Sequence, residues 1–367
     1  GPYEQIYDEA TESLTTKYMS GRMKISLPEV RRKISNKLIV KGARQHNLRD
    51  IDVTIPLNAL TVVTGVSGSG KTTLVKQILY PALKKQLEES YSKSPGMYEA
   101  LEGDLNLIDR IELVDQNPIG KSSRSNPVTY VKAYDTIRNL MANQQLSRIR
   151  GFKPKHFSFN VDGGRCDTCK GEGEQVIEMQ FLADVRLECE DCKGQRFKQE
   201  VLDVKYKAKN IFEVLDLSVE EALEFFADAR DVVNKLKPLF DVGLGYIKLG
   251  QSSSTLSGGE AQRVKLASFL AKDRSTEKIL FIFDEPTTGL HFHDISKLLK
   301  ALNALVENGH SVLVVEHNME VIKSADWVVD LGPGGGKEGG NLIFEGRPEE
   351  LVNVAESFTG KYLKEKL

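Results

Sequence analysis

The sequence has few of the features that mark secreted or membrane proteins. Only four of its 367 residues are cysteine, and no apolar run approaches the roughly 20 residues that a membrane-spanning helix needs. No amino-terminal stretch combines a basic start with an apolar segment, as a signal peptide does. These absences favour a cytoplasmic protein with no membrane partner, in which disulfides are not expected.

What is present is the composition of an ordinary globular protein, with 40% hydrophobic and 28% charged residues. At 367 residues the chain can bury a large core, and its length predicts two or three domains. It begins with Gly1-Pro2 rather than Met, a pair typical of the remnant left when a protease removes a purification tag. We therefore expect a piece of a longer protein.

The best-defined motif lies between Leu60 and Tyr80. A β-branched run predicts a strand, a periodic apolar pattern predicts a helix, and Gly65-Val-Ser-Gly-Ser-Gly-Lys71-Thr72 between them fits G-x-x-x-x-G-K-[ST]. In such a loop Lys71 would reach the β- and γ-phosphates and Thr72 would hold Mg²⁺. The alternative is a glycine-rich turn with an ordinary surface lysine. The predicted nucleotide contacts are Gly65, Ser67, Gly68, Ser69, Gly70, Lys71, Thr72 and Thr73.

A second stretch ends in two carboxylates. Ile279–Phe283 is a continuous apolar run, which predicts a buried parallel strand, and Asp284-Glu285 follows it directly. Asp284 suits a further carboxylate on the metal side, and Glu285 suits a base that orients the attacking water. Taken alone, the same pair also suits a turn or a helix start.

A third stretch, Leu256-Ser-Gly-Gly-Glu260, precedes a helical pattern. Ser257 can cap this helix, and Gly258 and Gly259 let backbone N–H groups approach an anion. By itself the stretch would indicate only a capped helix.

All four cysteines lie in a long segment between the phosphate loop and Ser257. They form two C-x-x-C pairs, with 19 residues (189 − 169 − 1) between the pairs. Four thiolates at this spacing predict a tetrahedral structural Zn²⁺ site. The alternatives are a redox pair or unrelated core cysteines. The predicted ligands are Cys166, Cys169, Cys189 and Cys192.

Positive charge is concentrated in one segment of a chain whose net charge is −2. Between Lys121 and Asn160 there are eight Lys or Arg and one acid, Asp135, a local net charge of +7 (8 − 1). This stripe suits the phosphate backbone of DNA, and the alternative is a solvated basic face. The predicted DNA contacts are Lys121, Arg124, Arg148, Arg150, Lys153 and Lys155, with Lys121 and Arg124 as the first choices.

Together, the phosphate loop, the Leu-Ser-Gly-Gly-Glu stretch and the carboxylate pair resemble the ATP-binding cassette family. The chain is more specifically similar to the UvrA family, the damage-recognition ATPases of bacterial nucleotide excision repair. The resemblance covers residues from about 10 to 350 and matches the carboxy-terminal cassette of that family. Its further motifs are Val114-Asp-Gln-Asn-Pro through Tyr130, the cysteine module, Gly243–Gly250, Thr287-Thr-Gly-Leu-His291 and Val315-Glu-His-Asn318.

This resemblance implies roles that the residues alone do not establish. Gln116 would sense Mg²⁺ and water, and His317 would serve the same ATP. Ser257 to Glu260 would complete a nucleotide site on another cassette. The implied partners are damaged double-stranded DNA, a sister subunit in a homodimer, and helicase-like and nuclease repair subunits that act through the full-length protein.

The expected fold is an α/β ATP-binding cassette with a large inserted domain that carries the four-cysteine zinc module. We expect a connector over 1–34, an ATP-binding core over 35–115 and 243–367, and an inserted DNA-binding domain over 116–242 with zinc bound at about 160–200. Two other functions are considered. A transporter motor subunit would have a short helical region in place of the zinc insert, and a scaffold would bind DNA and zinc without hydrolysing ATP.

Overall fold

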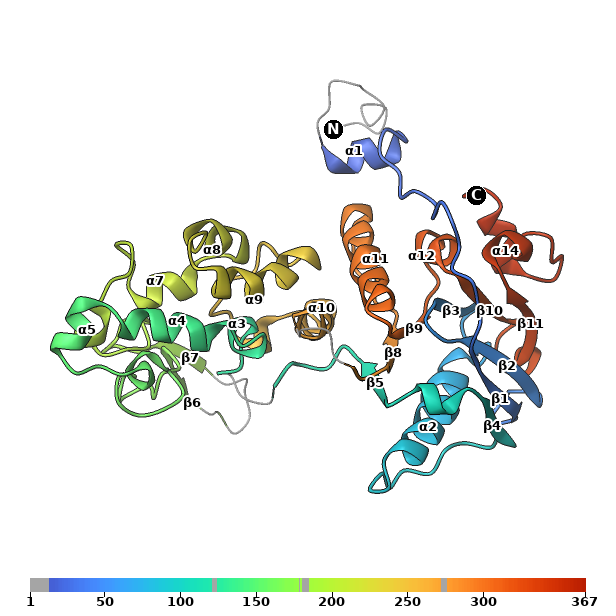
Figure 1. The fold of residues 1–367 in the computed structure, drawn as a ribbon, viewed down its shortest axis with the longest axis horizontal. Helices are drawn as coiled ribbons and strands as arrows, with labels where there is room; N and C mark the ends of the chain where they lie inside the picture. The colour runs from blue at the N-terminus through green and yellow to red at the C-terminus, as the bar shows by residue number, and fades with distance from the viewer. Residues whose placement is uncertain (1–12, 121–123, 178, 180–184, 272–275) are drawn as a thin grey trace. The chain divides into compact units, whose positions relative to one another are not determined.

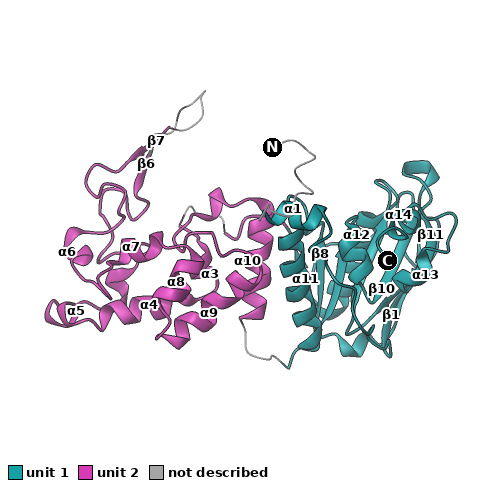
Figure 2. Cartoon of the chain, turned by 90° about the horizontal axis from the view of Figure 1, so that it is seen from above, with its two compact units in different colours: residues 1–115, 272–367 teal, residues 116–271 magenta. Residues whose placement is uncertain are grey.

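The computed structural model describes residues 13–120, 124–177, 179, 185–271 and 276–367. They divide into two units, coloured teal and magenta in Figure 2. The first comprises residues 1–115 and 272–367, and the second comprises residues 116–271. The chain therefore leaves the first unit once and returns to it once, so the second unit is an insertion. In the part that the structure describes, no helix combines the length and apolar character needed to cross a membrane.

The first unit is built around a six-stranded sheet in the order β11-β10-β3-β9-β8-β5 (Figure 1). Its neighbours pair in parallel from β10 to β5, and β11 is antiparallel to β10. All residues of β3 and β9 are buried, as apolar strands covered on both faces must be. The strands are β3 (Leu60–Gly65), β5 (Arg110–Val114), β8 (Ile279–Asp284), β9 (Ser311–Val315), β10 (Trp327–Gly332) and β11 (Asn341–Gly346).

A smaller antiparallel sheet, in the order β2-β1-β4, completes the strands described for this unit. One apolar cluster joins the two sheets, with Leu38 and Val53 from the small sheet and Val63 and Ile282 from the large one. The phosphate-loop helix contributes Ile78 to the same cluster. The strands are β1 (Lys37–Ala43), β2 (Ile51–Pro56) and β4 (Ala100–Gly103).

The helix after the phosphate loop begins with π-helical geometry over Thr73–Leu79 and continues as α2 (Tyr80–Leu87). The amphipathic helix α11 (Phe292–Glu307) buries Ile295, Leu298, Leu302 and Leu305, a helical spacing, and packs against β9. The other helices of this unit are α1 (Leu14–Met19), η3 (Leu105–Leu107), α12 (Met319–Ser324), η6 (Gly336–Glu338), α13 (Pro348–Leu351) and α14 (Phe358–Leu363).

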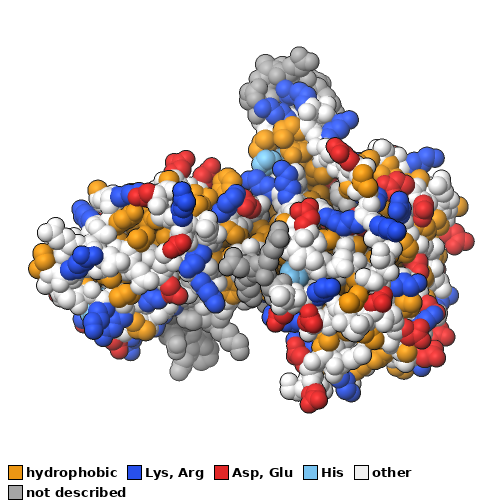
Figure 3. Space-filling view, viewed as in Figure 1, with side chains coloured by type: hydrophobic (Ala, Val, Ile, Leu, Met, Phe, Trp, Pro, Cys, Tyr) orange, Lys and Arg blue, Asp and Glu red, His pale blue; other side chains and the backbone are white. Residues whose placement is uncertain are grey.

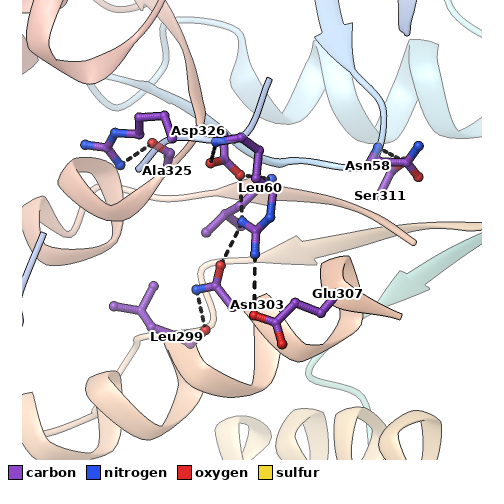
Figure 4. Close-up of polar contacts among 10 residues, drawn as sticks. Asn58, Leu60, Leu299, Asn303, Glu307, Ser311, Ala325 and Asp326 are labelled. Carbon is purple, nitrogen blue, oxygen red and sulfur yellow. Dashed lines mark hydrogen bonds and ion pairs between the residues drawn. The ribbon is translucent and has the colours of Figure 1, made fainter. Parts of the chain in front are cut away.

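One buried carboxylate ties the segment before β1 to the start of β3. Asp326 is 2% exposed and accepts hydrogen bonds from Arg32 N at 3.1 Å, Arg32 Nη1 at 2.8 Å and Leu60 N at 2.9 Å. Arg32 Nη1 also donates to Asn303 Oδ1 at 2.9 Å, and Figure 4 shows Asp326, Leu60 and Asn303 together. Because the buried charge is paired and hydrogen-bonded, its desolvation is offset.

The second unit is mainly helical, with a small β-hairpin. Helix α9 packs against α4, α8 and α10. Its described elements are α3 (Pro127–Tyr130), α4 (Ala133–Ala142), α5 (Gln145–Ile149), η4 (Pro154–Phe157), β6 (Glu174–Ile177), β7 (Val185–Glu188), α6 (Gln199–Leu202), α7 (Ile211–Asp216), α8 (Val219–Phe225), α9 (Arg230–Asp241), η5 (Ser253–Thr255) and α10 (Gly258–Leu270).

The two units differ from the predicted domains in two respects. The predicted connector over 1–34 falls within the first unit and is not a part of its own. The sequence analysis placed residues 243–271 in the core, whereas the contacts assign them to the second unit. The reason is packing: α10, which follows the Leu-Ser-Gly-Gly-Glu stretch, lies against α9 and α3.

Candidate functional site

The phosphate loop holds its lysine inside the protein. Lys71 is 6% exposed, and its Nζ donates to Gly65 O at 2.9 Å and to Val66 O at 2.8 Å. Burial lowers the pKa of Lys71, while nearby carboxylates that include Glu285 and Asp284 oppose the shift. The ammonium is therefore bonded to carbonyl oxygens of its own loop, which phosphate oxygens could replace with stronger, charge-assisted bonds.

Two glycines of the loop have backbone conformations that a side chain would strain. Gly65 has a φ of 130° and a Cβ on it would come 2.0 Å from Leu331 O, and Gly70 has a φ of 111°, so both positions require glycine. Ser69 Oγ is buried and has no hydrogen-bond partner among the described residues. An unsatisfied hydroxyl in a glycine-lined loop before a helix fits a phosphate ligand.

The other predicted contacts of the loop differ in exposure. Ser67, Gly68 and Thr72 are exposed, so each is accessible to a ligand. Thr73 opens the π-helix and is 9% exposed, so it faces protein more than solvent.

The predicted carboxylates lie at the carboxyl end of β8. Asp284, the last residue of this strand, forms an ion pair with Lys76 of the π-helix. Glu285 has a positive φ of 44°, which is uncommon for a residue with a side chain. Its N–H donates to Val315 O at 2.9 Å, a bond that fixes this conformation against the end of β9. Thr72 and Asp284 offer the oxygen ligands that Mg²⁺ prefers.

His317 follows β9 and lies beside Glu285. Its Nε2 is 3.8 Å from Glu285 Oε1. Burial lowers the pKa of His317 and Lys71 acts in the same direction, while Glu285 and Glu316 oppose them. The imidazole is therefore neutral at neutral pH, when it has one N–H to donate and one nitrogen to accept. The first unit thus brings Lys71, Asp284, Glu285 and His317 into one site.

The Leu-Ser-Gly-Gly-Glu stretch begins α10 in the second unit. Ser257 caps this helix as predicted: its Oγ accepts from Glu260 N at 3.3 Å, and Glu260 Oε2 accepts from Ser257 N at 2.7 Å. Gln116 belongs to the same unit, and a Cβ on Gly258 would come 3.0 Å from Gln116 Oε1. Gly258 and Gly259 lie in the first turn, at the positive end of the helix.

The four cysteines come together in the second unit. All are buried, and their sulfurs lie within 4.8 Å of one another, with Cys166 Sγ 3.9 Å from Cys189 Sγ and Cys169 Sγ 3.6 Å from Cys192 Sγ. A tetrahedron with Zn–S bonds of about 2.3 Å has sulfurs about 3.8 Å apart. The donor set and its spacing therefore fit one Zn²⁺. The hairpin β6–β7 connects the two C-x-x-C pairs.

The basic segment is partly neutralised by acids that lie outside it in the sequence. Arg124 Nε is 3.0 Å from Glu172 Oε1, and Arg150 Nη1 is 2.9 Å from Asp203 Oδ2. In the view of Figure 3, Lys and Arg side chains on the second unit stand singly or in small groups. Lys121 lies outside the described residues.

Three of the predicted DNA contacts remain accessible. Arg148, Lys153 and Lys155 are exposed, and none of them forms an ion pair with a carboxylate in the described part of the chain. All three come from one stretch around α5 and η4. They are therefore better placed than Arg124 or Arg150 to meet a polyanion.

The structure adds residues that the sequence analysis missed. Gly336, in a glycine-rich loop after β10, donates its N–H to Gly68 O at 3.0 Å. Asn47 Nδ2 bridges the two loops, with bonds to Gly68 O at 2.9 Å and Gly336 O at 3.1 Å. The glycine run was the only signal for this second loop, and no signal marked Asn47 or Lys76.

Comparisons with known proteins agree with this geometry. No protein-family model matches the sequence. UvrABC system protein A of Clostridium perfringens is 54% identical over 356 residues, which are 97% of this chain and 38% of that protein. The protein of the same name from Staphylococcus aureus strain COL is 53% identical over 357 residues, which are 97% of this chain and 37% of that protein.

A solved structure leads to the same conclusion. The crystal structure of UvrA2 from Deinococcus radiodurans matches with a TM-score of 0.87 at 44% identity, over 97% of this chain and 42% of that one. The fold is therefore that of the predicted cassette with its inserted domain. The chain spans about two fifths of the length of these proteins, and by sequence and by fold it belongs to the UvrA family.

Proposed function

We propose that this chain is the carboxy-terminal ATP-binding cassette of a DNA-damage-recognition ATPase of nucleotide excision repair, and that it couples ATP binding and hydrolysis to binding of damaged duplex DNA. The observation that carries the proposal is the site in the first unit, where a buried Lys71 lies in a phosphate loop beside Asp284, Glu285 and His317. The relatives named UvrABC system protein A support the repair role.

In this proposal Lys71 leaves the two loop carbonyls and bonds to the β- and γ-phosphates of ATP. Thr72 and Asp284 hold Mg²⁺, which would neutralise charge on the phosphates. Glu285 accepts a hydrogen bond from the attacking water and directs it at the γ-phosphate. His317, neutral because of its lowered pKa, donates its N–H to a γ-phosphate oxygen.

The second unit contributes to nucleotide chemistry in a different way. Gln116 would respond to the metal and the water of this chain's own ATP. Ser257, Gly258 and Gly259 would present the positive end of α10 to ATP held by another cassette, as the family resemblance implies. The sister subunit of a homodimer and the helicase-like and nuclease repair subunits would then act with the full-length protein.

The decisive test is Glu285→Gln. The amide keeps the size of the side chain but cannot act as a base, so turnover should fall by about a hundredfold or more while ATP affinity stays within about twofold. Isothermal titration and single-turnover hydrolysis measure the two quantities. Turnover near the wild-type value would assign water activation to another group, and an inactive wild-type chain that binds DNA would favour the scaffold function.

DNA binding is assigned to the accessible basic residues of the second unit. Lesion sensing that is independent of sequence requires contacts to phosphates and to duplex shape rather than to base edges. Arg148, Lys153 and Lys155 are the best candidates, with Arg124, Arg150 and Lys121 as further ones. Each phosphate contact that is lost should lower the slope of log affinity against log salt by about 0.9.

A triple alanine variant of Arg148, Lys153 and Lys155 should therefore weaken duplex binding and flatten its salt dependence. The matched control removes the same charge from exposed lysines of the first unit, Lys85, Lys93 and Lys361. Fluorescence anisotropy at several salt concentrations gives both affinity and slope. Equal behaviour of the two triple variants would mean that these residues form only a solvated face.

The cysteine cluster is proposed as a structural Zn²⁺ site. Cys166, Cys169, Cys189 and Cys192 supply four sulfur ligands, so no coordination position is left for a substrate, and the metal would hold the module together. One equivalent of zinc per chain is expected by metal analysis. A zinc module in this insertion does not suit the transporter alternative, which needs only a short helical region there.

A further inference from the structure

Glu316 is a buried carboxylate that the proposed mechanism does not use. It lies at the end of β9, directly before His317, and is 3% exposed. In the part of the chain that the structure describes, it forms no ion pair. A buried charge of this kind must be held by hydrogen bonds, because water does not solvate it.

Four hydrogen bonds converge on the two oxygens of Glu316. Oε1 accepts from Thr287 N at 2.9 Å and from Thr287 Oγ1 at 2.5 Å. Oε2 accepts from His317 N at 2.7 Å and from Asn318 N at 2.9 Å. One carboxylate therefore joins the turn after β8 to the segment after β9.

The two joined segments carry the groups proposed to act on the γ-phosphate. Thr287 is two residues after Glu285, whose positive φ depends on the shape of this turn. His317 is the residue whose own N–H bonds to Glu316. Glu316 thus holds the two segments in a fixed relative position, and this position sets the distance of 3.8 Å between His317 Nε2 and Glu285 Oε1.

We infer that Glu316 is a positioning residue for hydrolysis, which fixes Glu285 and His317 relative to each other without touching the nucleotide. The inference rests on the proposed ATPase function. A carboxylate suits the position because both of its oxygens accept hydrogen bonds. Gln would accept at one oxygen only and would direct its NH₂ group at two N–H or O–H donors, so the two segments would separate. Small misplacements of catalytic groups are sufficient to cost up to about a hundredfold in rate.

The test compares Glu316→Gln with Asp326→Asn. Asp326 is the matched control because it is an equally buried, multiply bonded carboxylate of the same unit that contacts none of the four site residues. Both variants should lower the melting temperature. Only Glu316→Gln should lower single-turnover hydrolysis, by about tenfold or more, with the ATP dissociation constant within about twofold of wild type.

The outcomes separate the inference from the function on which it rests. If the wild-type chain hydrolyses ATP and the two variants have the same turnover, Glu316 is only structural and the inference is wrong. If the wild-type chain binds ATP without hydrolysing it, the proposed function and the inference both fail. If Glu316→Gln does not fold, Thr287→Val decides, since it removes one of the four bonds and should still lower turnover without changing ATP affinity.

Discussion

The two units differ in what holds their candidate sites in shape. In the first, the proposed ATP site lies at the ends of strands whose side chains form a large apolar cluster, including Val63, Leu313 and Val315. In the second, the four cysteines form a buried cluster of their own. The adjoining hairpin leaves Ile177 and Leu187 48% and 49% exposed, so it adds little apolar burial.

This difference shows how each site depends on its ligand. In the proposed ATP site, Lys71 is bonded to loop carbonyls, Glu285 N–H to Val315 O, and His317 N–H to the Glu316 carboxylate, so the positions of these residues do not depend on a ligand. The cysteine site brings four sulfurs within 4.8 Å of one another, and without a metal thiols make only weak hydrogen bonds to each other. Its order should therefore come from the metal, and removal of either ligand should affect the two units differently.

The largest expected effect is that of zinc removal. Cys166→Ser should abolish zinc binding and unfold the module, because structural Zn²⁺ contributes roughly 10 kcal/mol or more to small metal-dependent folds. Hydrogen exchange should rise over residues 165–198 and stay unchanged in β9. Thr168→Ala is the matched control, because Thr168 lies between Cys166 and Cys169 but is not a proposed ligand. If hydrogen exchange in β9 rose as much as in the cysteine module, the core would also depend on the metal.

Next in size is the loss of the phosphate-loop ammonium. Lys71→Ala removes charge-assisted hydrogen bonds worth roughly 1.5–3 kcal/mol each, so ATP affinity should fall at least about tenfold. Because the loop is preformed, the exchange protection of β3 should not change. Calorimetry on this variant and on Lys85→Ala, which removes an exposed lysine of α2, tests the assignment. Unchanged ATP affinity would exclude Lys71 from the nucleotide site.

The same contrast explains how far the sequence alone could lead. β-branched and apolar runs predicted β3 and β8 almost to the residue, because buried parallel strands have continuous apolar sequences. The spacing of the four cysteines predicted their cluster, since few arrangements satisfy two C-x-x-C pairs. The edge strand β11 and its neighbour β10 interrupt their apolar residues with polar ones, such as Asn341 and Asp330, and were not predicted.

What the sequence could not show are contacts between residues that are distant along the chain. Glu172 and Asp203 neutralise Arg124 and Arg150 from outside the basic segment, so a local charge count overstates the free charge. Lys76 lies in the π-helical segment and pairs with Asp284, which is more than 200 residues away in the sequence (284 − 76 = 208). Both features arise from tertiary structure rather than from local propensity.

A smaller effect is expected from Lys76, a contact of the proposed ATP site that has to change when metal binds. Its ammonium pairs with the carboxylate proposed to hold Mg²⁺, so the metal must displace it. The two side chains are 31% and 25% exposed, and such pairs contribute less than about 1 kcal/mol. Lys76→Ala should therefore lower the Mg²⁺ concentration needed for ATP binding by up to about fivefold, whereas Lys76→Arg should not. A higher Mg²⁺ requirement in the alanine variant would contradict this.

An effect of similar, small size concerns the pH dependence of the core. His310 is 8% exposed and its Nδ1 accepts from Ile279 N at 3.3 Å, so burial lowers the pKa of His310. Below the unfolded value of about 6.5 the unfolded chain binds the proton more readily, so stability should fall with acidification, by at most about 1.4 kcal/mol per pH unit. His310→Gln keeps a hydrogen-bond acceptor at this position but removes the group that titrates. Urea unfolding at about pH 7 and at about pH 5.5 gives the free energy of unfolding, which should fall less on acidification in the variant than in the wild type. An equal fall in both would mean that His310 is protonated as readily in the folded core as in the unfolded chain.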